Sequence, residues 1–476
     1  MIPVHLRTLA LAGTLSLTGS AGGAENPPLN VYSAGAGTVF EASSRSYSLA
    51  LKGIPSEERL AFQVGDSLFS DNWVIAPSST TGRDGLGPLF NTRGCSGCHL
   101  KDGRGKPPAG PDDAPVGWLI RLSYAGQDGD GQTVYLPDPN YGGQIQNRAI
   151  PGVPAEARIA VHWETVRTEQ TGPDAPASYP DGPTPDLRRL RIELRDAAYG
   201  PFVDGLLISP RLAPPVIGLG LLEAIPQEAI LANADPEDAD GDGVSGRPNH
   251  ILHAASGTIR QGRFGWKANQ PDLNQQNAGA FLGDLGITTP LFNTDNCTGA
   301  QSACLAAPAG GTPEDPELNA HKLERVNLYI RLLAVPARRN WEDPAVRRGD
   351  RLFTEAACDS CHTRSFTTGS EAAHELLKNQ TIFPYTDLLL HDMGPALADG
   401  RPDGEATGQE WRTPPLWGIG LTGTVNGSEF FMHDGRARTL EEAILWHGGE
   451  GTLSRNRFMT MTRADREALL AFLGSL

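Results

Sequence analysis

The sequence predicts a mainly α-helical protein of two domains, the first of which contains a large, loop-rich insertion. Two observations predict the helices: a helical pattern precedes each of two identical Cys-x-x-Cys-His motifs, and an amphipathic segment closes the chain. A third observation predicts the loops, because the 476 residues include 56 Gly and 38 Pro, a larger share than the ~12% of average proteins.

Residues 1–24 have the layout of an export signal. Arg7 supplies an early positive charge, residues 9–17 are mostly apolar, and small residues lead to Ala24. We therefore expect a signal peptide at 1–24 and a periplasmic mature protein; the alternative is an ordinary N-terminal helix, which Gly13 disfavours. No later segment has the ~20 apolar residues that a membrane span needs, so we expect no membrane span.

The predicted domains cover residues 25–337 and 338–476. Ser56 is expected to cap a helix before the first motif, and Asp343 with Pro344 opens a helix before the second. Further helices are expected from Asn319 to Leu333, where Pro336 ends the first domain, and after Thr462. Stretches 167–187 and 298–318 are expected to be surface loops because they are rich in Pro, Gly and Thr.

Each domain contains one Cys-x-x-Cys-His motif. The two motifs are Cys95-Ser96-Gly97-Cys98-His99 and Cys358-Asp359-Ser360-Cys361-His362. This pattern is the attachment signature of c-type haem, in which two thioethers hold the porphyrin and the adjacent His binds the iron. We therefore expect two covalently bound haem c groups, and domains that resemble class I cytochrome c. The alternatives are a four-cysteine zinc site and thioredoxin-like dithiols.

The two remaining cysteines, Cys297 and Cys304, close a short loop rich in Gly and Ala. In an exported protein, which meets an oxidising compartment, we expect them to form a structural disulfide.

The sixth coordination position of each iron decides its chemistry, because a strong ligand gives electron transfer and an open position admits small oxidants. After Met1 there is no methionine before Met393, and after His99 there is no histidine before His162. We therefore expect an open or weakly filled first haem. The alternatives are a Lys, a Tyr or one of the remote histidines, which are His162, His250, His253 and His321.

The second haem has many candidate ligands, which are His391, Met393, Met432, His433, His447, Met459 and Met461. Thr439 and Glu442 have the spacing of a capping box. In the helix that it would open, Leu440, Ile444 and His447 fall on one face. This buried position favours His447 as the ligand, although a His there can also be an ordinary core residue.

Several short runs resemble a known family. They are Arg412-Thr413-Pro414-Pro415, Phe431-Met432-His433-Asp434-Gly435, His391-Asp392-Met393-Gly394-Pro395 and Trp446-His447-Gly448-Gly449-Glu450. Together with the two haem motifs, they resemble the di-haem oxidoreductases, a branch of the bacterial di-haem cytochrome c peroxidase superfamily whose members are described as peroxidases or thiol oxidoreductases. The resemblance covers most of the expected mature chain and also implies that His447 is the ligand.

In those peroxidases, a Gln and a Glu ten residues apart lie over the open haem. The resemblance therefore implies catalytic roles for Gln146 and Glu156, with Gln144 as a competing Gln; the alternative is a surface loop. A carboxylate can move a proton between the two oxygens of hydrogen peroxide. The peroxidases also place a Trp between their haems, for which Trp118 and Trp266 are the candidates.

Two weaker expectations concern charged residues. Asp238, Asp240 and Asp242 match the first half of a calcium loop, although Asn249 stands where an EF-hand has its Glu, and an acidic turn is the alternative. Arg412, and also Arg436, could bind haem propionates.

The expected function is that of a periplasmic di-haem oxidoreductase acting on hydrogen peroxide. A small redox protein such as a cytochrome c or a cupredoxin would pass electrons through the C-terminal haem to the open N-terminal haem. The net charge of −16 favours a basic soluble donor and argues against nucleic acid as a partner. The alternatives are an electron-transfer cytochrome without turnover and an enzyme that oxidises a protein or thiol substrate.

Overall fold

The computed structural model describes residues 27–172 and 175–476, so the predicted signal peptide lies outside the described residues. The prediction of a mainly α-helical protein is wrong. Only 28% of the chain is helical, and 18% forms strands in many small sheets. Within the described ranges, no helix is long and apolar enough to cross a membrane.

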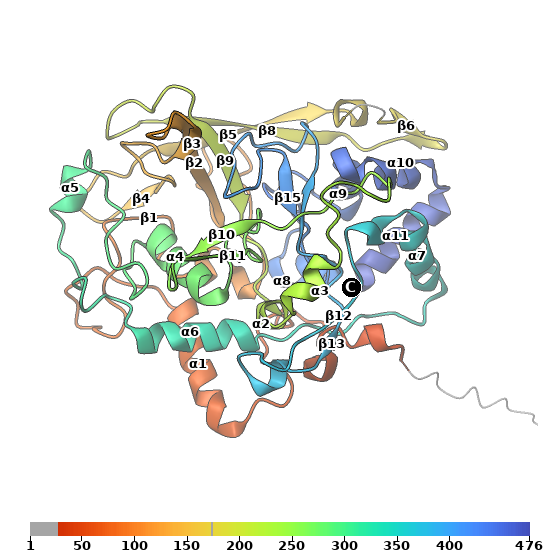
Figure 1. The fold of residues 1–476 in the computed structure, drawn as a ribbon, viewed down its shortest axis with the longest axis horizontal. Coiled ribbons are helices and arrows are strands. Elements are labelled where there is room, and N and C mark those ends of the chain that lie inside the picture. Colours follow the sequence, from red (N-terminus) through yellow and green to blue (C-terminus); the bar gives the residue numbers. More distant parts are fainter. Residues whose placement is uncertain (1–26, 173–174) are drawn as a thin grey trace, which may run out of the picture.

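The helices and strands alternate irregularly along the chain (Figure 1). The helices are α1 (Ser56–Ser70), α2 (Leu219–Glu223), α3 (Gln227–Leu231), α4 (Leu273–Leu285), α5 (Ser302–Leu305), α6 (Ala320–Leu332), α7 (Pro344–Glu355), α8 (Thr422–Asn426), α9 (Leu440–Leu445), α10 (Thr452–Thr460) and α11 (Arg463–Ser475). The strands are β1 (Leu89–Phe90), β2 (Trp118–Gln127), β3 (Thr133–Leu136), β4 (Arg148–Ala149), β5 (Arg158–Val166), β6 (Ser178–Tyr179), β7 (Gly182–Pro183), β8 (Leu187–Arg195), β9 (Leu207–Leu212), β10 (His250–His253), β11 (Thr258–Gln261), β12 (Phe366–Thr367), β13 (Thr381–Ile382), β14 (Leu390–Asp392) and β15 (Glu410–Arg412).

Two helix pairs flank the two Cys-x-x-Cys-His motifs. α1 packs against α6 beside the first motif, and α7 packs against α11 beside the second (Figure 1). Each pair crosses at a glycine: a Cβ on Gly65 would lie 2.1 Å from the carbonyl oxygen of Arg325, and a Cβ on Gly349 would lie 2.0 Å from that of Ala468. The close approach of the two backbones therefore requires a residue without a side chain.

The predicted helix starts are confirmed with one exception. Asp343 accepts a hydrogen bond from the amide of Ala345, while Asn319 and Thr462 cap α6 and α11 in the same way. Ser56 is not a cap, because Pro55 occupies that position and Ser56 is the first helical residue.

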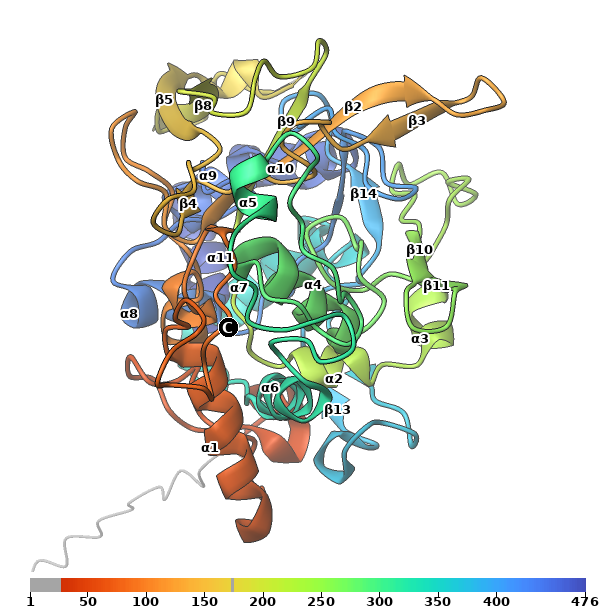
Figure 2. The ribbon, with the colours of Figure 1, turned by 90° about the vertical axis from the view of Figure 1, so that its left-hand side faces the viewer.

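The strands that the sequence analysis missed lie mostly between residues 118 and 212. β2 pairs with β3 and β9 in a three-stranded antiparallel sheet, and β5 pairs with β8 along nine residues of each strand. The β2–β3 hairpin projects from one edge of the molecule (Figure 2). Trp118, Ile120 and Leu122 alternate with more exposed residues along β2, the period of two that is typical of a strand. Stretch 167–187, predicted to be loop, contains the short β6 and β7.

Two large apolar clusters form the core, and each joins segments from both ends of the chain. The first contains residues from α1, α4 and α6 together with Leu388 and Trp417. The second contains residues from α7, α10 and α11 together with Val166, Tyr179 and Leu187. The β5–β8 ribbon runs along the upper edge of the molecule toward α10, where the ring of Tyr179 meets that of Phe458 at 6.3 Å (Figure 1).

Candidate functional site

Each Cys-x-x-Cys-His motif opens onto a cavity. The first cavity, of ≈ 270 Å³, is lined by Cys95, Cys98 and His99 and by one face of α4. The second, of ≈ 160 Å³, is lined by Cys358, Cys361 and His362 and by residues of α9. The molecule thus contains two separate chambers, each of which has one motif in its wall.

The four motif cysteines are free thiols that lie in pairs. Burial raises the pKa of Cys98 and of Cys358 to about 12, so these thiols are not activated for dithiol exchange. The two pairs line different cavities, which excludes a four-cysteine zinc site. Among the described residues, no group of three or more potential metal ligands with atoms within 4.8 Å of one another includes a cysteine.

Both motif histidines are held in the orientation that an iron ligand needs. Nδ1 of His99 lies 2.7 Å from the carbonyl oxygen of Pro214, and Nδ1 of His362 lies 2.9 Å from that of Tyr385. A carbonyl can only accept, so each Nδ1 carries the proton and Nε2 is left as a free base. Burial lowers the pKa of both residues, that of His362 to about 4, which keeps the imidazoles neutral.

His447 has the same arrangement in the wall of the second cavity. Its Nδ1 lies 2.8 Å from the carbonyl oxygen of Ala443, and burial lowers its pKa. Leu440 and Ile444 line the same cavity, as the helical spacing predicted. The capping box is only half formed: Thr439 accepts from the amide of Glu442, but the Glu442 carboxylate binds Arg438 instead of returning to Thr439.

Four other candidate ligands also line the second cavity, which are His391, Met393, Met432 and His433, whereas Met459 and Met461 do not line it. His391 lies between two carboxylates, 2.7 Å from Asp387 and 2.6 Å from Glu450. Although burial opposes a charge there, these carboxylates raise the pKa of His391 well above its usual value, so both ring nitrogens are protonated and cannot bind iron. His433 stacks on Trp411 with ring centroids 3.6 Å apart.

The first cavity offers no second ligand of this kind. Among the described residues that line it, His99 is the only histidine, and Met, Lys and Tyr are absent. The remote histidines that the sequence left open line neither cavity; they are His162, His250, His253 and His321. The two chambers therefore differ, because among the described residues the first is lined by one histidine and no methionine, and the second by several residues of both kinds.

Arg104 lies in the wall that the two cavities share, a role that the sequence analysis missed. It lines both cavities, and its Nε and Nη1 atoms are buried without a hydrogen-bond partner. Burial lowers its pKa to about 10, so the group stays charged. Orphaned guanidinium nitrogens next to both motifs suit the carboxylates of a porphyrin. Arg104 stands between Gly103 and Gly105 and belongs to no motif that would have indicated this role.

The two arginines predicted from the sequence, unlike Arg104, have hydrogen-bond or ion-pair partners within the protein. Arg412 lines both cavities, but its Nε donates to the carbonyl oxygen of Gly265 and its Nη1 to that of Thr413. Arg436 lines neither cavity and binds Asp434.

Of the two tryptophan candidates, only Trp266 lies between the chambers. It lines both cavities, and its Nε1 donates to the carbonyl oxygen of Leu212 at 2.8 Å. Trp118 lines neither cavity and donates to the carbonyl oxygen of Asp434.

The structure does not bring Gln146 and Glu156 to the wall of the first cavity. Glu156 is 1% exposed; one carboxylate oxygen accepts from the amide of Gln146 and the other from Nε2 of Gln301, both at 2.6 Å. Burial raises its pKa to about 8. The Gln146 side chain donates to the carbonyl oxygen of Gly283 in α4, and neither Gln146 nor Glu156 lines the first cavity.

Two carboxylates line the first cavity: Asp284, in the last turn of α4, and Asp403, which is paired with Arg401 at 2.9 Å. Asp284 shares one face of the helix with Gln276 and Ala280, which also line the cavity. Its Oδ1 accepts a hydrogen bond from Nε2 of Gln144 at 2.9 Å. The sequence analysis missed Asp284, although this spacing of four residues on a helical face could have indicated it.

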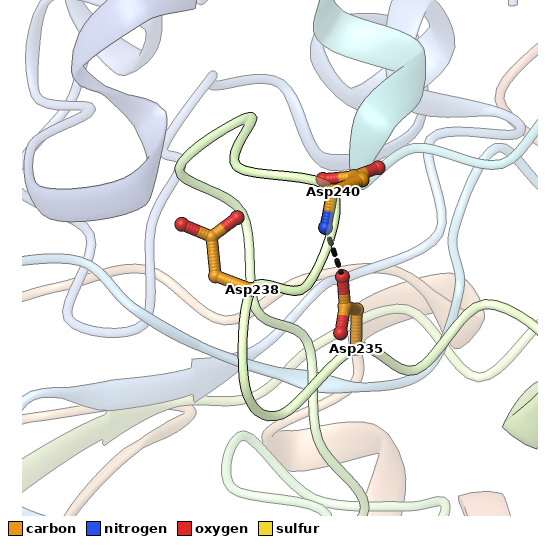
Figure 3. Close-up of side chains that lie close together, drawn as sticks. All are labelled: Asp235, Asp238 and Asp240. Carbon is orange, nitrogen blue, oxygen red and sulfur yellow. Dashed lines mark hydrogen bonds between the residues drawn. The ribbon is translucent and has the colours of Figure 1, made fainter.

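The acidic loop gathers a different set of carboxylates from the predicted one. Asp235, Asp238 and Asp240 have oxygens within 4.8 Å of one another (Figure 3), whereas Asp242 is outside this group. Asp235, which the sequence analysis did not consider, also accepts from the amide of Ala239 at 2.8 Å. The prediction that Cys297 and Cys304 form a disulfide is confirmed.

Comparisons with known proteins agree with these features. The family model described as "Di-haem oxidoreductase, putative peroxidase" matches residues 30–119 and 200–476, and leaves out the segment that holds the β5–β8 ribbon. No curated protein matches the chain with significant similarity.

Two solved structures are similar in part. Hydrazine synthase from Kuenenia stuttgartiensis is 14% identical, with 99% of this chain and 100% of that chain covered and a TM-score of 0.34. The diheme peroxidase BthA from Burkholderia thailandensis E264 is 18% identical, with 54% and 80% covered and a TM-score of 0.27. Because the family model spans most of the sequence, including both motifs, the chain belongs to the di-haem oxidoreductase family and uses haem.

Proposed function

We propose that this protein is a periplasmic di-haem peroxidase in which hydrogen peroxide reacts in the first cavity and electrons enter through the second. The observation that carries the proposal is the difference between the chambers. His362 and His447 both present a free Nε2 to the second cavity, whereas His99 alone does so in the first. Two ligands suit an electron-transfer centre, and one ligand leaves a position open for a small oxidant.

The residues present fit two covalently held haem c groups. Cys95 and Cys98 in one chamber, and Cys358 and Cys361 in the other, would form the thioethers, while Arg104 would bind propionates on both sides of the shared wall. When bound, haem supplies the redox chemistry that turns over peroxide. The chain's own residues orient the imidazoles through the hydrogen bonds from their Nδ1 atoms to backbone carbonyls.

Trp266 supports electron passage between the chambers, because its indole is part of both walls. It also meets His433 at a ring-centroid distance of 6.5 Å. These neighbouring aromatic rings offer electrons a shorter route between the two chambers than a path along the backbone. The donor is a basic one-electron redox protein, since the chain's net charge of −16 attracts such a partner at low ionic strength.

We also propose that the acidic loop binds calcium through Asp235, Asp238 and Asp240. Carboxylate oxygens are the ligands that this ion prefers. Asp242 would stay outside the coordination shell, because it is not part of the group whose carboxylate oxygens lie within 4.8 Å of one another. Metal analysis after exhaustive dialysis against a chelator, with Asp235→Asn as a variant and Asp242→Asn as its control, tests this assignment.

The decisive experiment combines mass, spectra and turnover of the purified protein. We expect a mass increase of two haems, one high-spin and one low-spin ferric signal, and peroxide-dependent oxidation of a reduced basic cytochrome c. Two low-spin signals without peroxide turnover would identify an electron carrier instead. Turnover of a thiol or protein substrate with no peroxide consumption would identify the other class of enzyme.

A further inference from the structure

We infer that Asp284, held by Gln144, is the carboxylate that transfers the proton between the two oxygens of hydrogen peroxide in the first cavity. This inference rests on the proposed peroxidase function and names a residue for it. It departs from the expectation for Glu156, because a proton-transfer group has to reach the substrate.

The position of Asp284 meets that requirement. It lines the first cavity, in which His99 presents its free Nε2. Its Oδ1 is fixed by Nε2 of Gln144, which also donates to Asn91 at 2.7 Å and to the carbonyl oxygen of Gly283 at 3.0 Å. Among the described residues no side chain or backbone group binds Oδ2 of Asp284, so this oxygen is left for a molecule in the cavity.

The electrostatic surroundings suit a group that must both accept and release a proton. Burial raises the pKa of Asp284 above its usual value, and Arg121, which lines the same cavity, partly opposes this rise. The carboxylate also lies at the C-terminal end of α4, where the negative end of the helix dipole disfavours a further negative charge. A carboxylate with a raised pKa is a better base than an ordinary surface Asp.

Glu156 does not line the first cavity, and its hydrogen-bonding oxygens are already paired within the protein. Both of its oxygens accept hydrogen bonds, from Gln146 and from Gln301, and it lines neither cavity. Gln146 and Gln144 both donate to the carbonyl oxygen of Gly283, so the two glutamines support the turn of α4 that presents Asp284. Glu156 therefore has a structural role next to Gln146 and not a role in proton transfer.

The proposed reduction of hydrogen peroxide balances in both protons and electrons. Asp284 takes the hydrogen of one peroxide oxygen and gives it to the other while the O–O bond breaks. The departing oxygen keeps the electron pair of that bond and leaves as water with two hydrogens. The remaining oxygen becomes a second water with two electrons, one from each of two molecules of the reduced donor protein, and two protons from solvent. Asp284 ends the cycle as it began, ionised.

The test compares Asp284→Asn with Asp284→Glu and Glu156→Gln in the haem-loaded protein. The Asn variant keeps an oxygen for Gln144 but cannot take up a proton. We expect it to lose about 10²–10⁴-fold in the rate of reaction with peroxide, the usual contribution of a general base. It should also bind potassium cyanide more slowly, because hydrogen cyanide must lose its proton to bind as the anion.

Asp284→Glu should recover part of both rates, and Glu156→Gln should stay close to the parent. The low-spin spectrum of the second haem reports on folding and loading in every variant. Parent-like peroxide and cyanide rates in Asp284→Asn would overturn the inference, as would a Glu156→Gln variant that loses both. If the parent itself reacts with neither peroxide nor cyanide, the proposed function fails together with the inference; a reactive parent with an unaffected Asp284→Asn variant refutes the inference alone.

Discussion

The buried Glu156 should make the stability of the protein depend on pH, and Glu156→Gln should remove that dependence. Burial, opposed by the hydrogen bonds from Gln146 and Gln301, raises the pKa of this carboxyl from 4.5 to about 8. A carboxyl whose pKa is raised on folding stabilises the native state fully below pH 4.5, and this contribution is lost as the pH rises through 8. The pKa change corresponds to roughly 5 kcal/mol over the whole range.

Guanidinium unfolding of the parent and of Glu156→Gln at pH 5 and pH 7 measures this contribution. Between these values we expect the parent to lose about 2–3 kcal/mol more than the variant. At pH 5 the variant should be the less stable protein by ~1–3 kcal/mol, because its amide accepts from only one of the two N–H donors and leaves the other buried and unpaired. Equal pH slopes in the two proteins, within ~0.5 kcal/mol, would refute the reasoning.

Three further predictions concern the haem-loaded protein. Arg104→Gln should lower the midpoint potentials of both haems by tens of millivolts, since ~59 mV corresponds to ~1.4 kcal/mol for one electron; a redox titration in which only one haem responds would contradict a shared anchor. His447→Ala should add a second cyanide-binding haem to the spectrum, whereas His433→Ala should not. Replacing Cys297 and Cys304 by Ser should cost roughly 2.5 kcal/mol of stability, the entropy of closing so short a loop, and thermal unfolding measures this loss.

The parts of the site that could be predicted from the sequence depend on local signals. The Cys-x-x-Cys-His motifs, the helical face that carries His447 and the disulfide loop each lie within about ten residues, so spacing alone describes them. Strand β8 could also have been found, because Leu190, Ile192 and Leu194 alternate with charged residues. The Pro-rich stretch that precedes β8 is typical of a loop and obscures this alternation, and without the strands the predicted fold class was wrong.

The cavity walls could not be predicted because they join segments that are distant in the sequence. Gln144 and Asp284 are 140 residues apart and meet only because α4 packs behind the loop that follows β3. Arg104 faces both chambers only after Phe431, from the other end of the chain, packs against its guanidinium at 5.7 Å. The resemblance implied catalytic roles for Gln146 and Glu156, but it could not show that neither side chain lines the first cavity.

Each of the two large apolar clusters contains residues from both predicted domains, so neither cluster is complete until both parts of the chain are present. Leu388 and Trp417 complete the apolar cluster around α1, while Tyr179 and Leu187 complete the one around α11. A nascent chain that stops near residue 337 therefore exposes the apolar surface that Leu388 and Trp417 cover in the folded protein. The later half alone likewise exposes the apolar surface that Tyr179 and Leu187 cover. Final consolidation has to wait for the end of synthesis, and separately expressed fragments should be rescued by mixing them rather than folding in isolation.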